Sequence, residues 1–252
     1  MRRFLIVNAD DCNLTEGVTS AILDCHDHGI LSSTTFMMNL PISQKAVREL
    51  KQRKNLGVGI HLNVTLGRPV TDPKKIRSLL QGPGDFRKYA EQTSKLPKAS
   101  ELVLEYQSQI NLFKKVFGRN PTHLDTHHQL HDAAFFFHAL VEVAKKNRLP
   151  IRRSRLTRAR SSFPHTDFFF GNLRPREHWT PEPLETLLQH LPEGVSEIMC
   201  HPGKNDPQLR AASSFTTDRE VEWKIFRDKK WRRLLQEHQI KLGNYAAAFN
   251  QR

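Results

Sequence analysis

A chain of 252 residues, of which 38% are hydrophobic, is long enough to form one large domain with its own core, and its formal net charge is +13. It contains no apolar run of the roughly 18–20 residues that span a bilayer, and acidic residues interrupt the basic-then-apolar start that a secretory signal would need. Cys12, Cys25 and Cys200 form no Cys-x-x-Cys pair and cannot all be bridged, which favours a reducing, cytoplasmic setting.

Eight of the basic residues lie within residues 145–160, a stretch that contains no acidic side chain. Such a run is most simply a solvated surface, but it also fits a site for an anionic substrate group or a nucleic-acid surface. The stretch lacks the interleaved aromatic side chains on which bases stack, and the chain has no Cys/His finger or RNA-recognition signature. The sequence therefore argues against nucleic-acid binding as the main function.

Short apolar or β-branched runs alternate with amphipathic segments in the first part of the chain, which predicts strands and helices in turn. The predicted order is strand 4–9, a helix that stops at Gly29, strand 32–39, a helix that begins after Pro41 and Ser43, and strand 56–64. Residues 65–99 are rich in proline, glycine and charge, and they predict a long loop or a lid inserted into the domain.

The same alternation continues to the end of the chain. The predicted elements are a helix over 100–117 with Ser100 as N-cap and Gly118 after its end, a strand from 121, a helix over 132–147, a strand in 149–154, a helix near 182–191, strand 196–203, a helix near 217–237 and a strand at 240–244. This pattern predicts a single α/β domain over 1–252, a distorted (β/α) TIM-like barrel of about seven strands. The chain has no glycine-rich phosphate loop of the kind that an open nucleotide-binding sheet uses.

Potential metal ligands collect at the predicted carboxyl ends of the strands. They are Asp10 and Asp11 after the first strand, His61 late in "LGVGIHLN", Asp125, His127 and His128 in "THLDTHH", and His201 after "EIMC". In a parallel barrel these strand ends open onto one face, where barrel enzymes keep their active sites. A carboxylate with two imidazoles suits a borderline divalent metal that keeps open positions for water and substrate.

The adjacent carboxylates of Asp10 and Asp11 set a geometric condition. Neighbouring side chains of a strand point to opposite faces, so both can face the barrel mouth only if the strand ends or bends there. Asn13 and Thr15, which favour turns and helix caps, are consistent with such a bend. One aspartate could then bind the metal while the other takes a proton from water.

Five segments in order, "LIVNADD", "SSTTFMMN", "GVGIHLNVTLGRPV", "PTHLDTHHQLH" and "EIMCHPG", resemble the YdjC-like (ChbG/HpnK-like) carbohydrate deacetylases, and the similarity covers nearly the whole chain. The resemblance implies a barrel related to the polysaccharide deacetylases. It also implies a hydrolase that removes the acetyl group from an N-acetylated amino sugar, oligosaccharide or glycoconjugate, using one divalent metal ion, Mg²⁺ or Zn²⁺.

Roles for individual residues follow from their positions in these motifs. The resemblance implies Asp11, His61 and His127 as metal ligands, Asp10 as catalytic base and His201 as general acid. We further expect Asp125 to accept a hydrogen bond from the far nitrogen of a ligand histidine, and His128 to lie beside the ligands. We expect Arg152 to reach the mouth and bind an anionic group of the substrate.

The chain departs from the family pattern in two places. Cys12 and Asn13 stand where the family usually has Phe-Gly, which would alter the turn after the metal aspartate and bring an oxidisable thiol near the site. Gln129 stands where the family often has a third consecutive histidine, so a substrate contact there would differ.

Two other functions are compatible with the residues. A metal phosphoesterase or nuclease would use the Asp/His cluster together with the positive charge, but it would need a second metal about 3.5–4 Å from the first. A binding protein for anionic ligands would use residues 145–160 and would need none of the candidate ligands. By base rate, a homodimer is the expected assembly.

Overall fold

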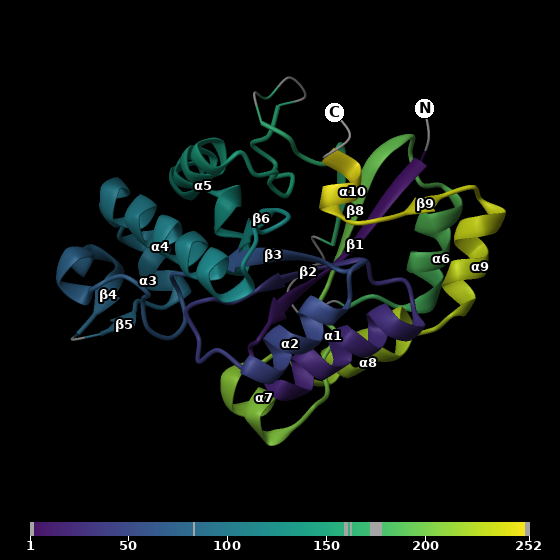
Figure 1. Ribbon diagram of the computed structural model, residues 1–252, viewed down its shortest axis with the longest axis horizontal. Coiled ribbons are helices and arrows are strands. Elements are labelled where there is room, and N and C mark those ends of the chain that lie inside the picture. Colours follow the sequence, from purple (N-terminus) through teal and green to yellow (C-terminus); the bar gives the residue numbers. More distant parts are fainter. Residues whose placement is uncertain (1–2, 83, 159–160, 162, 172–177, 250–252) are drawn as a thin grey trace.

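A seven-stranded parallel sheet lies at the centre of the computed structural model, which describes residues 3–82, 84–158, 161, 163–171 and 178–249 (Figure 1). Its strands run in the order β6 (Leu124–Thr126), β3 (Gly57–Leu62), β2 (Ser33–Phe36), β1 (Arg3–Cys12), β8 (Gly194–Cys200) and β7 (Phe168–Phe170), and β9 (Lys241–Leu242) also pairs with β1. Every pairing in this sheet is parallel. The carboxyl ends of β1, β3, β6 and β8 therefore lie at the same edge.

Backbone pairing continues past β6 and curls the sheet toward closure. Single parallel bridges join Leu124 to Ile151 and Ile151 to His165, which lies shortly before β7. This arrangement confirms the predicted distorted barrel. The strand predicted over 149–154 is reduced to the single residue Ile151, which makes both of these bridges.

Helices cover the outside of the curled sheet, and most of them end where the capping residues predict. The side chain of Ser43 accepts a hydrogen bond from the Ala46 amide at the start of α2, and Gly118 ends α4 in the left-handed conformation with φ 69°. The main helices are α1 (Glu16–His28), α2 (Gln44–Gln52), α4 (Ala99–Phe117), α5 (Ala134–Asn147), α6 (Pro181–Gln189), α8 (Thr217–Phe226) and α9 (Lys230–Glu237), with the shorter α7 (Pro207–Ala212) and α10 (Tyr245–Phe249).

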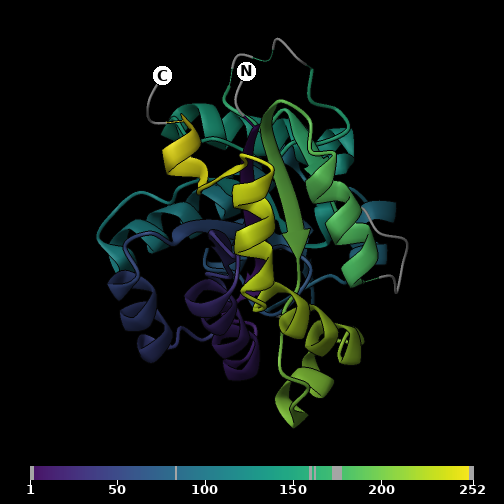
Figure 2. The same ribbon diagram turned by 90° about the vertical axis from the view of Figure 1, so that its right-hand side faces the viewer.

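Two of the helix predictions are wrong in detail. The N-cap position of α4 is Lys98 rather than Ser100, which lies inside the helix. The single helix predicted near 217–237 is two helices, because the Asp228 side chain accepts a hydrogen bond from the Lys230 amide and starts a new helix there. The resulting change of direction lets α9 pack against α6 on the same side of the sheet (Figure 2).

The segment 65–99 has more structure than a bare loop. It contains the 3-10 turns η1 (Pro73–Lys75) and η2 (Arg77–Leu79), a two-stranded antiparallel ribbon of β4 (Leu80–Gln81) and β5 (Asp85–Phe86), and helix α3 (Tyr89–Ser94). Buried polar side chains attach it to the barrel. The Glu105 carboxylate accepts the amides of Val70 and Thr71 at 3.0 and 2.9 Å, and Gln92 donates to two carbonyls.

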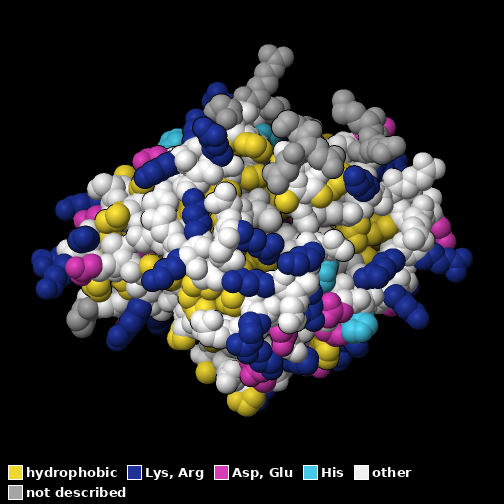
Figure 3. Space-filling model, in the orientation of Figure 1, with side chains coloured by type: hydrophobic (Ala, Val, Ile, Leu, Met, Phe, Trp, Pro, Cys, Tyr) yellow, Lys and Arg dark blue, Asp and Glu magenta, His cyan; other side chains and the backbone are white. Residues whose placement is uncertain are grey.

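The basic run at 145–160 does not form one surface. Arg152 is fully buried, while Lys145 and Lys146 lie on α5 and Arg155 and Arg158 are exposed beyond it; residues 159 and 160 lie outside the described residues. On the face drawn in Figure 3, Lys and Arg side chains are scattered over many elements. Among the described helices, none is both long enough and apolar enough to cross a membrane.

Candidate active site

Asp10 and Asp11 lie in a β-bulge near the end of β1. Ala9 pairs with Thr34 and Cys12 with Phe36, so β1 has one more residue than β2 between these two pairs. Asp11 takes up the extra residue with a left-handed backbone, φ 64°, a conformation that aspartate tolerates better than most residues. In a regular strand these two adjacent side chains would point to opposite faces, but the bulge lets both carboxylates face the same pocket.

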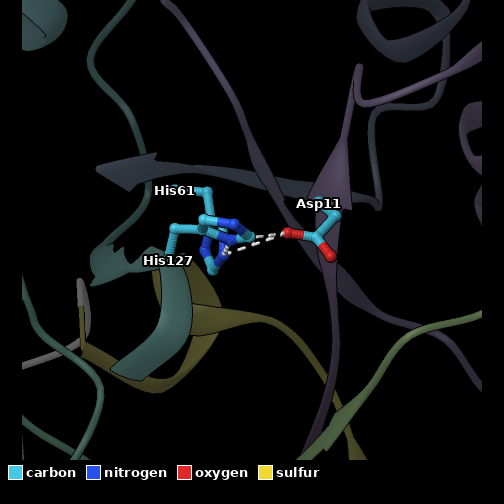
Figure 4. Close-up of side chains that lie close together, drawn as sticks. All are labelled: Asp11, His61 and His127. Carbon is cyan, nitrogen blue, oxygen red and sulfur yellow. Dashed lines mark hydrogen bonds and ion pairs between the residues drawn. The ribbon is translucent and has the colours of Figure 1, made fainter. Parts of the chain in front are cut away.

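Three side chains from different strand ends converge beside the bulge (Figure 4). Asp11 Oδ1 lies 3.2 Å from His61 Nε2 and 3.1 Å from His127 Nδ1, and the two nitrogens are 3.3 Å apart. Atoms that share one ion at about 2.0–2.2 Å stand roughly 3 Å from one another. Asp11 Oδ1 is also buried, and no described residue makes a well-formed hydrogen bond to it. The three donors therefore fit a single divalent cation.

His61 is oriented by the residue behind it. Its Nδ1 lies 2.7 Å from Asp125 Oδ1, and Thr35 donates to the other oxygen of Asp125 at 3.0 Å. This pairing places the ring proton on Nδ1 and leaves Nε2 to face Asp11 and His127. Burial lowers the pKa of His61, but the carboxylates of Asp125, Asp10 and Asp11 outweigh it and raise the pKa to about 10. The site thus strongly favours a positive charge at this point.

Arg152 does not reach the mouth, and the expectation that it binds an anionic substrate group is wrong. Its side chain is fully buried inside the barrel, where both Nη atoms contact the Asp10 carboxylate at 2.6 and 2.7 Å. Nη2 also lies 2.9 Å from Asp125 Oδ2, and Nε donates to Glu197 at 2.9 Å. The cluster of Asp10, His61 and Asp125 is therefore already supplied with a cation, so it does not provide a second metal site.

Asp10 and His201 lie together on the pocket wall. Asp10 Oδ1 accepts from Asn8 at 3.0 Å, while Oδ2 lies 3.9 Å from His201 Nε2. Desolvation lowers the pKa of His201 to about 4, against the opposing effect of Asp10, so the imidazole is neutral near pH 7. At this distance the two side chains are neighbours without a direct hydrogen bond, and neither belongs to the three converging side chains.

The pocket above these residues has a volume of about 700 Å³. His128 and Gln129 line it with left-handed backbones, φ 56° and 49°, a strained pair of the kind that collects at functional sites. Thr65 holds His128 Nδ1 at 3.1 Å, and Tyr89 of α3 meets the His128 ring edge-on at 5.3 Å between centroids. A larger hollow of about 1360 Å³ follows α1 and α2 but contains none of the candidate residues.

Helix α8 supplies two buried residues that the sequence analysis missed. Arg219 Nη2 lies 2.6 Å from Asp11 Oδ2, and the Glu222 carboxylate accepts the amides of His201 and Trp179 at 2.5 and 3.1 Å. The sequence could have indicated them only through their spacing, because residues three positions apart lie on one face of a helix. That spacing is equally common on solvated helices, so it did not distinguish these residues.

Cys12, the departure from the family pattern beside Asp11, turns into the core. It is fully buried and absent from the pocket lining, and burial raises the pKa of its thiol to about 12. The neighbouring Asn13 adopts φ 75° and holds the loop before α2 by accepting from the Ser43 amide at 3.2 Å. A left-handed residue therefore stands where the family usually has glycine.

Nearly the whole chain is similar to proteins of one known family. A family model described as YdjC-like protein matches residues 4–237. Carbohydrate deacetylases of Thermoanaerobacter pseudethanolicus and Vibrio cholerae are 32% and 33% identical, with 97% and 96% of this chain and 98% and 95% of theirs covered.

Solved structures show the same fold. A protein of Enterococcus faecalis, provisionally named a cellobiose-phosphate cleavage protein, superposes with a TM-score of 0.89 at 27% identity, covering 98% of this chain and 99% of that one. A family 4 carbohydrate esterase of Streptomyces lividans, at 10% identity and a TM-score of 0.53 over 96% of this chain and 92% of its own, shares the fold.

Proposed function

Because the chain belongs to the YdjC-like protein family, we propose that it is a metal-dependent deacetylase acting on an N-acetylated amino sugar, oligosaccharide or glycoconjugate. The observation that carries the proposal is that potential metal ligands and potential proton-transfer residues line the same pocket. Asp11, His61 and His127 converge as metal donors, and Asp10 and His201 stand beside them as a proton-transfer pair.

The donor set favours a zinc-like ion over magnesium. Asp11, His61 and His127 would hold it through one carboxylate oxygen and two imidazole nitrogens, whereas Mg²⁺ prefers an all-oxygen shell with several waters. When bound, such an ion supplies a Lewis acid for the acetyl carbonyl and lowers the pKa of water.

The proton transfers fall to Asp10 and His201. Asp10, held by Arg152 and Asn8, accepts a proton from the water that attacks the acetyl carbon. His201 is neutral at rest, so it first takes up the proton that Asp10 has accepted, for which the 3.9 Å between Asp10 Oδ2 and His201 Nε2 requires only a small movement. The resulting imidazolium donates that proton to the nitrogen of the sugar as the C–N bond breaks, so that acetate and a free amine leave.

The pocket wall suits a sugar ring. Tyr89, whose side chain is 45% exposed, and the half-buried Phe215 line the pocket with aromatic surface. A pyranose presents a flat face of C–H groups and a rim of hydroxyls, and tyrosine offers an apolar ring with a polar tip to match both. The polar groups of His128 and Gln129 face the same space.

A phosphoesterase or nuclease is less well supported. Chemistry of that kind would draw on a second metal ion, and the second acidic cluster of the described residues surrounds the guanidinium of Arg152. The scattered basic side chains likewise mark no track for a nucleic-acid backbone on the face shown in Figure 3.

Acetate release tests the proposal. The protein, stripped with EDTA and reloaded with Zn²⁺ or Mg²⁺, is incubated with N-acetylglucosamine oligomers, and Asp10→Asn is compared with the exposed control Asp85→Asn. We expect acetate with reloaded protein, more with Zn²⁺, and a fall in kcat of about 10²–10⁴ for Asp10→Asn with zinc binding retained. The proposal fails if no N-acetyl substrate yields acetate, or if Asp10→Asn is as active as Asp85→Asn.

A further inference from the structure

The two oxygens of Asp11 have different neighbours. Oδ1 faces the nitrogens of His61 and His127 at 3.2 and 3.1 Å, whereas Oδ2 lies 2.6 Å from Nη2 of Arg219. In the described part of the chain, Arg219 and these two histidines are the side chains that face this carboxylate, and Arg219 makes the well-formed hydrogen bond to it.

We propose that Arg219 is a positioning residue for the metal centre, which holds Asp11 so that Oδ1 alone is presented to the ion. The inference rests on the proposed metal site and adds to it a residue on α8, far from the ligands in the sequence. An aspartate with both oxygens free could turn or bind through both of them. With Oδ2 occupied by a guanidinium, the third donor is fixed before the ion arrives.

Arg219 is itself held firmly enough for this task. Its side chain is 5% exposed, Nε donates to the Phe215 carbonyl at 2.9 Å, and the guanidinium lies over the Phe215 ring at 5.6 Å. Its carbonyl accepts the amide of Gly203 at 3.0 Å, which ties α8 to the loop after β8. The planar head therefore cannot follow Asp11 if the aspartate turns.

The need for such a residue comes from the bulge. The left-handed backbone of Asp11 places its side chain outside the regular alternation of β1, so strand geometry does not orient the carboxylate. Nη1 of Arg219 is buried without a partner among the described residues, and the side chain lines the pocket. The guanidinium can therefore also donate to a water or a substrate oxygen beside Asp11.

Metal binding tests this role apart from activity. Zn²⁺ is titrated calorimetrically into EDTA-stripped wild type, Arg219→Gln and Arg219→Lys, and the visible spectrum of the Co²⁺-loaded forms reports the ligand geometry. The control is Arg227→Gln, which removes an arginine at the end of the same helix that is 43% exposed and pairs with Asp24. We expect Kd for Zn²⁺ to rise about 10–100-fold in Arg219→Gln, less in Arg219→Lys, and not in the control.

The spectrum distinguishes positioning from loss of charge. Both Arg219 variants should change the Co²⁺ spectrum, because a lysine cannot hold Asp11 and the Phe215 carbonyl in one plane. Wild-type Kd and spectrum in Arg219→Gln would overturn the inference, and if that variant does not fold, an unchanged spectrum in Arg219→Lys would do so. If the wild type releases acetate and both variants bind metal normally, the role of Arg219 is refuted and the proposed function stands. If the wild type binds zinc but releases no acetate, the proposed function is refuted and the role of Arg219 stands.

Discussion

Replacing Arg152 with methionine should test whether the centre of the barrel is held by charge. The guanidinium contacts the carboxylates of Asp10, Asp125 and Glu197 at 2.6–2.9 Å, and its side chain has no exposed surface. Methionine fills much of the same volume but leaves three acidic groups without their cation. The change therefore removes the charge and keeps most of the packing.

Removal of one partner from a buried ion pair costs about 3–5 kcal/mol, because an uncompensated charge remains in the interior. Arg152 serves three carboxylates, so we expect the free energy of unfolding to fall by at least ~4 kcal/mol at pH 8. Total stabilities of about 5–15 kcal/mol make this a large fraction. The surface pair of Arg53 with Asp27, at 2.6 Å, provides the control, and Arg53→Met should cost under about 1 kcal/mol.

Urea unfolding at pH 8 and pH 5 measures both the size and the origin of the loss. Burial opposes ionisation of Asp125, while Arg152 and His61 hold its pKa well below the ordinary value in the parent protein. Without Arg152 the buried carboxyl groups hold protons more tightly in the folded state, so the difference between variant and parent should shrink as the pH falls. A loss no larger than that of Arg53→Met, or one that is equal at the two pH values, would refute this reasoning.

Three further outcomes are expected. Asp125→Ala removes the acceptor behind His61 and should weaken zinc binding about 10–100-fold in calorimetry; an unchanged Kd would show that the ring needs no such support. Burial lowers the pKa of His123 to about 3, below its value in the unfolded chain, so this residue costs stability as the pH falls below about 6.5. His123→Phe should therefore reduce the loss of unfolding free energy between pH 7.5 and pH 5 by about 2 kcal/mol, and an equal loss in both proteins would contradict this. Tyr89→Ala should raise KM for a sugar substrate about 2–10-fold with little change in kcat, whereas Tyr89→Phe should retain most of the binding; equal KM values in all three would exclude a substrate contact.

Local signals in the sequence were sufficient for several of the strands and helices that build the barrel, though not for all of them. The Ser43 cap, the left-handed Gly118 and the apolar run of β1 lie where the pattern predicts them, because each depends on neighbours a few residues away. The parallel order of the strands also follows from alternating strands and helices. The convergence of Asp11, His61 and His127 could therefore be predicted, since parallel strands carry their last residues to one edge.

Other features depend on contacts that no local pattern records. A bulge that adds one residue to β1 lets Asp10 and Asp11 face one pocket. The sequence showed only that the strand must end or bend for this to happen, not that a bulge is present. Tyr89 looked like part of a loop because the buried polar anchors of its segment, such as Glu105, lie within an ordinary helix. Their role is visible only when the two segments are in contact.

By itself, the sequence determined the family, the strand–helix order and the carboxylate and imidazole donors, because these depend on composition and on spacing along the chain. The tertiary structure decided what surrounds those donors. Arg152 meets Asp10 across 142 positions and Arg219 meets Asp11 across 208, so the sequence placed Arg152 wrongly at the mouth and did not single out Arg219. The physical reason is that buried charges need partners: once folding removes water from the carboxylates, only the packed arrangement determines which cation compensates each of them.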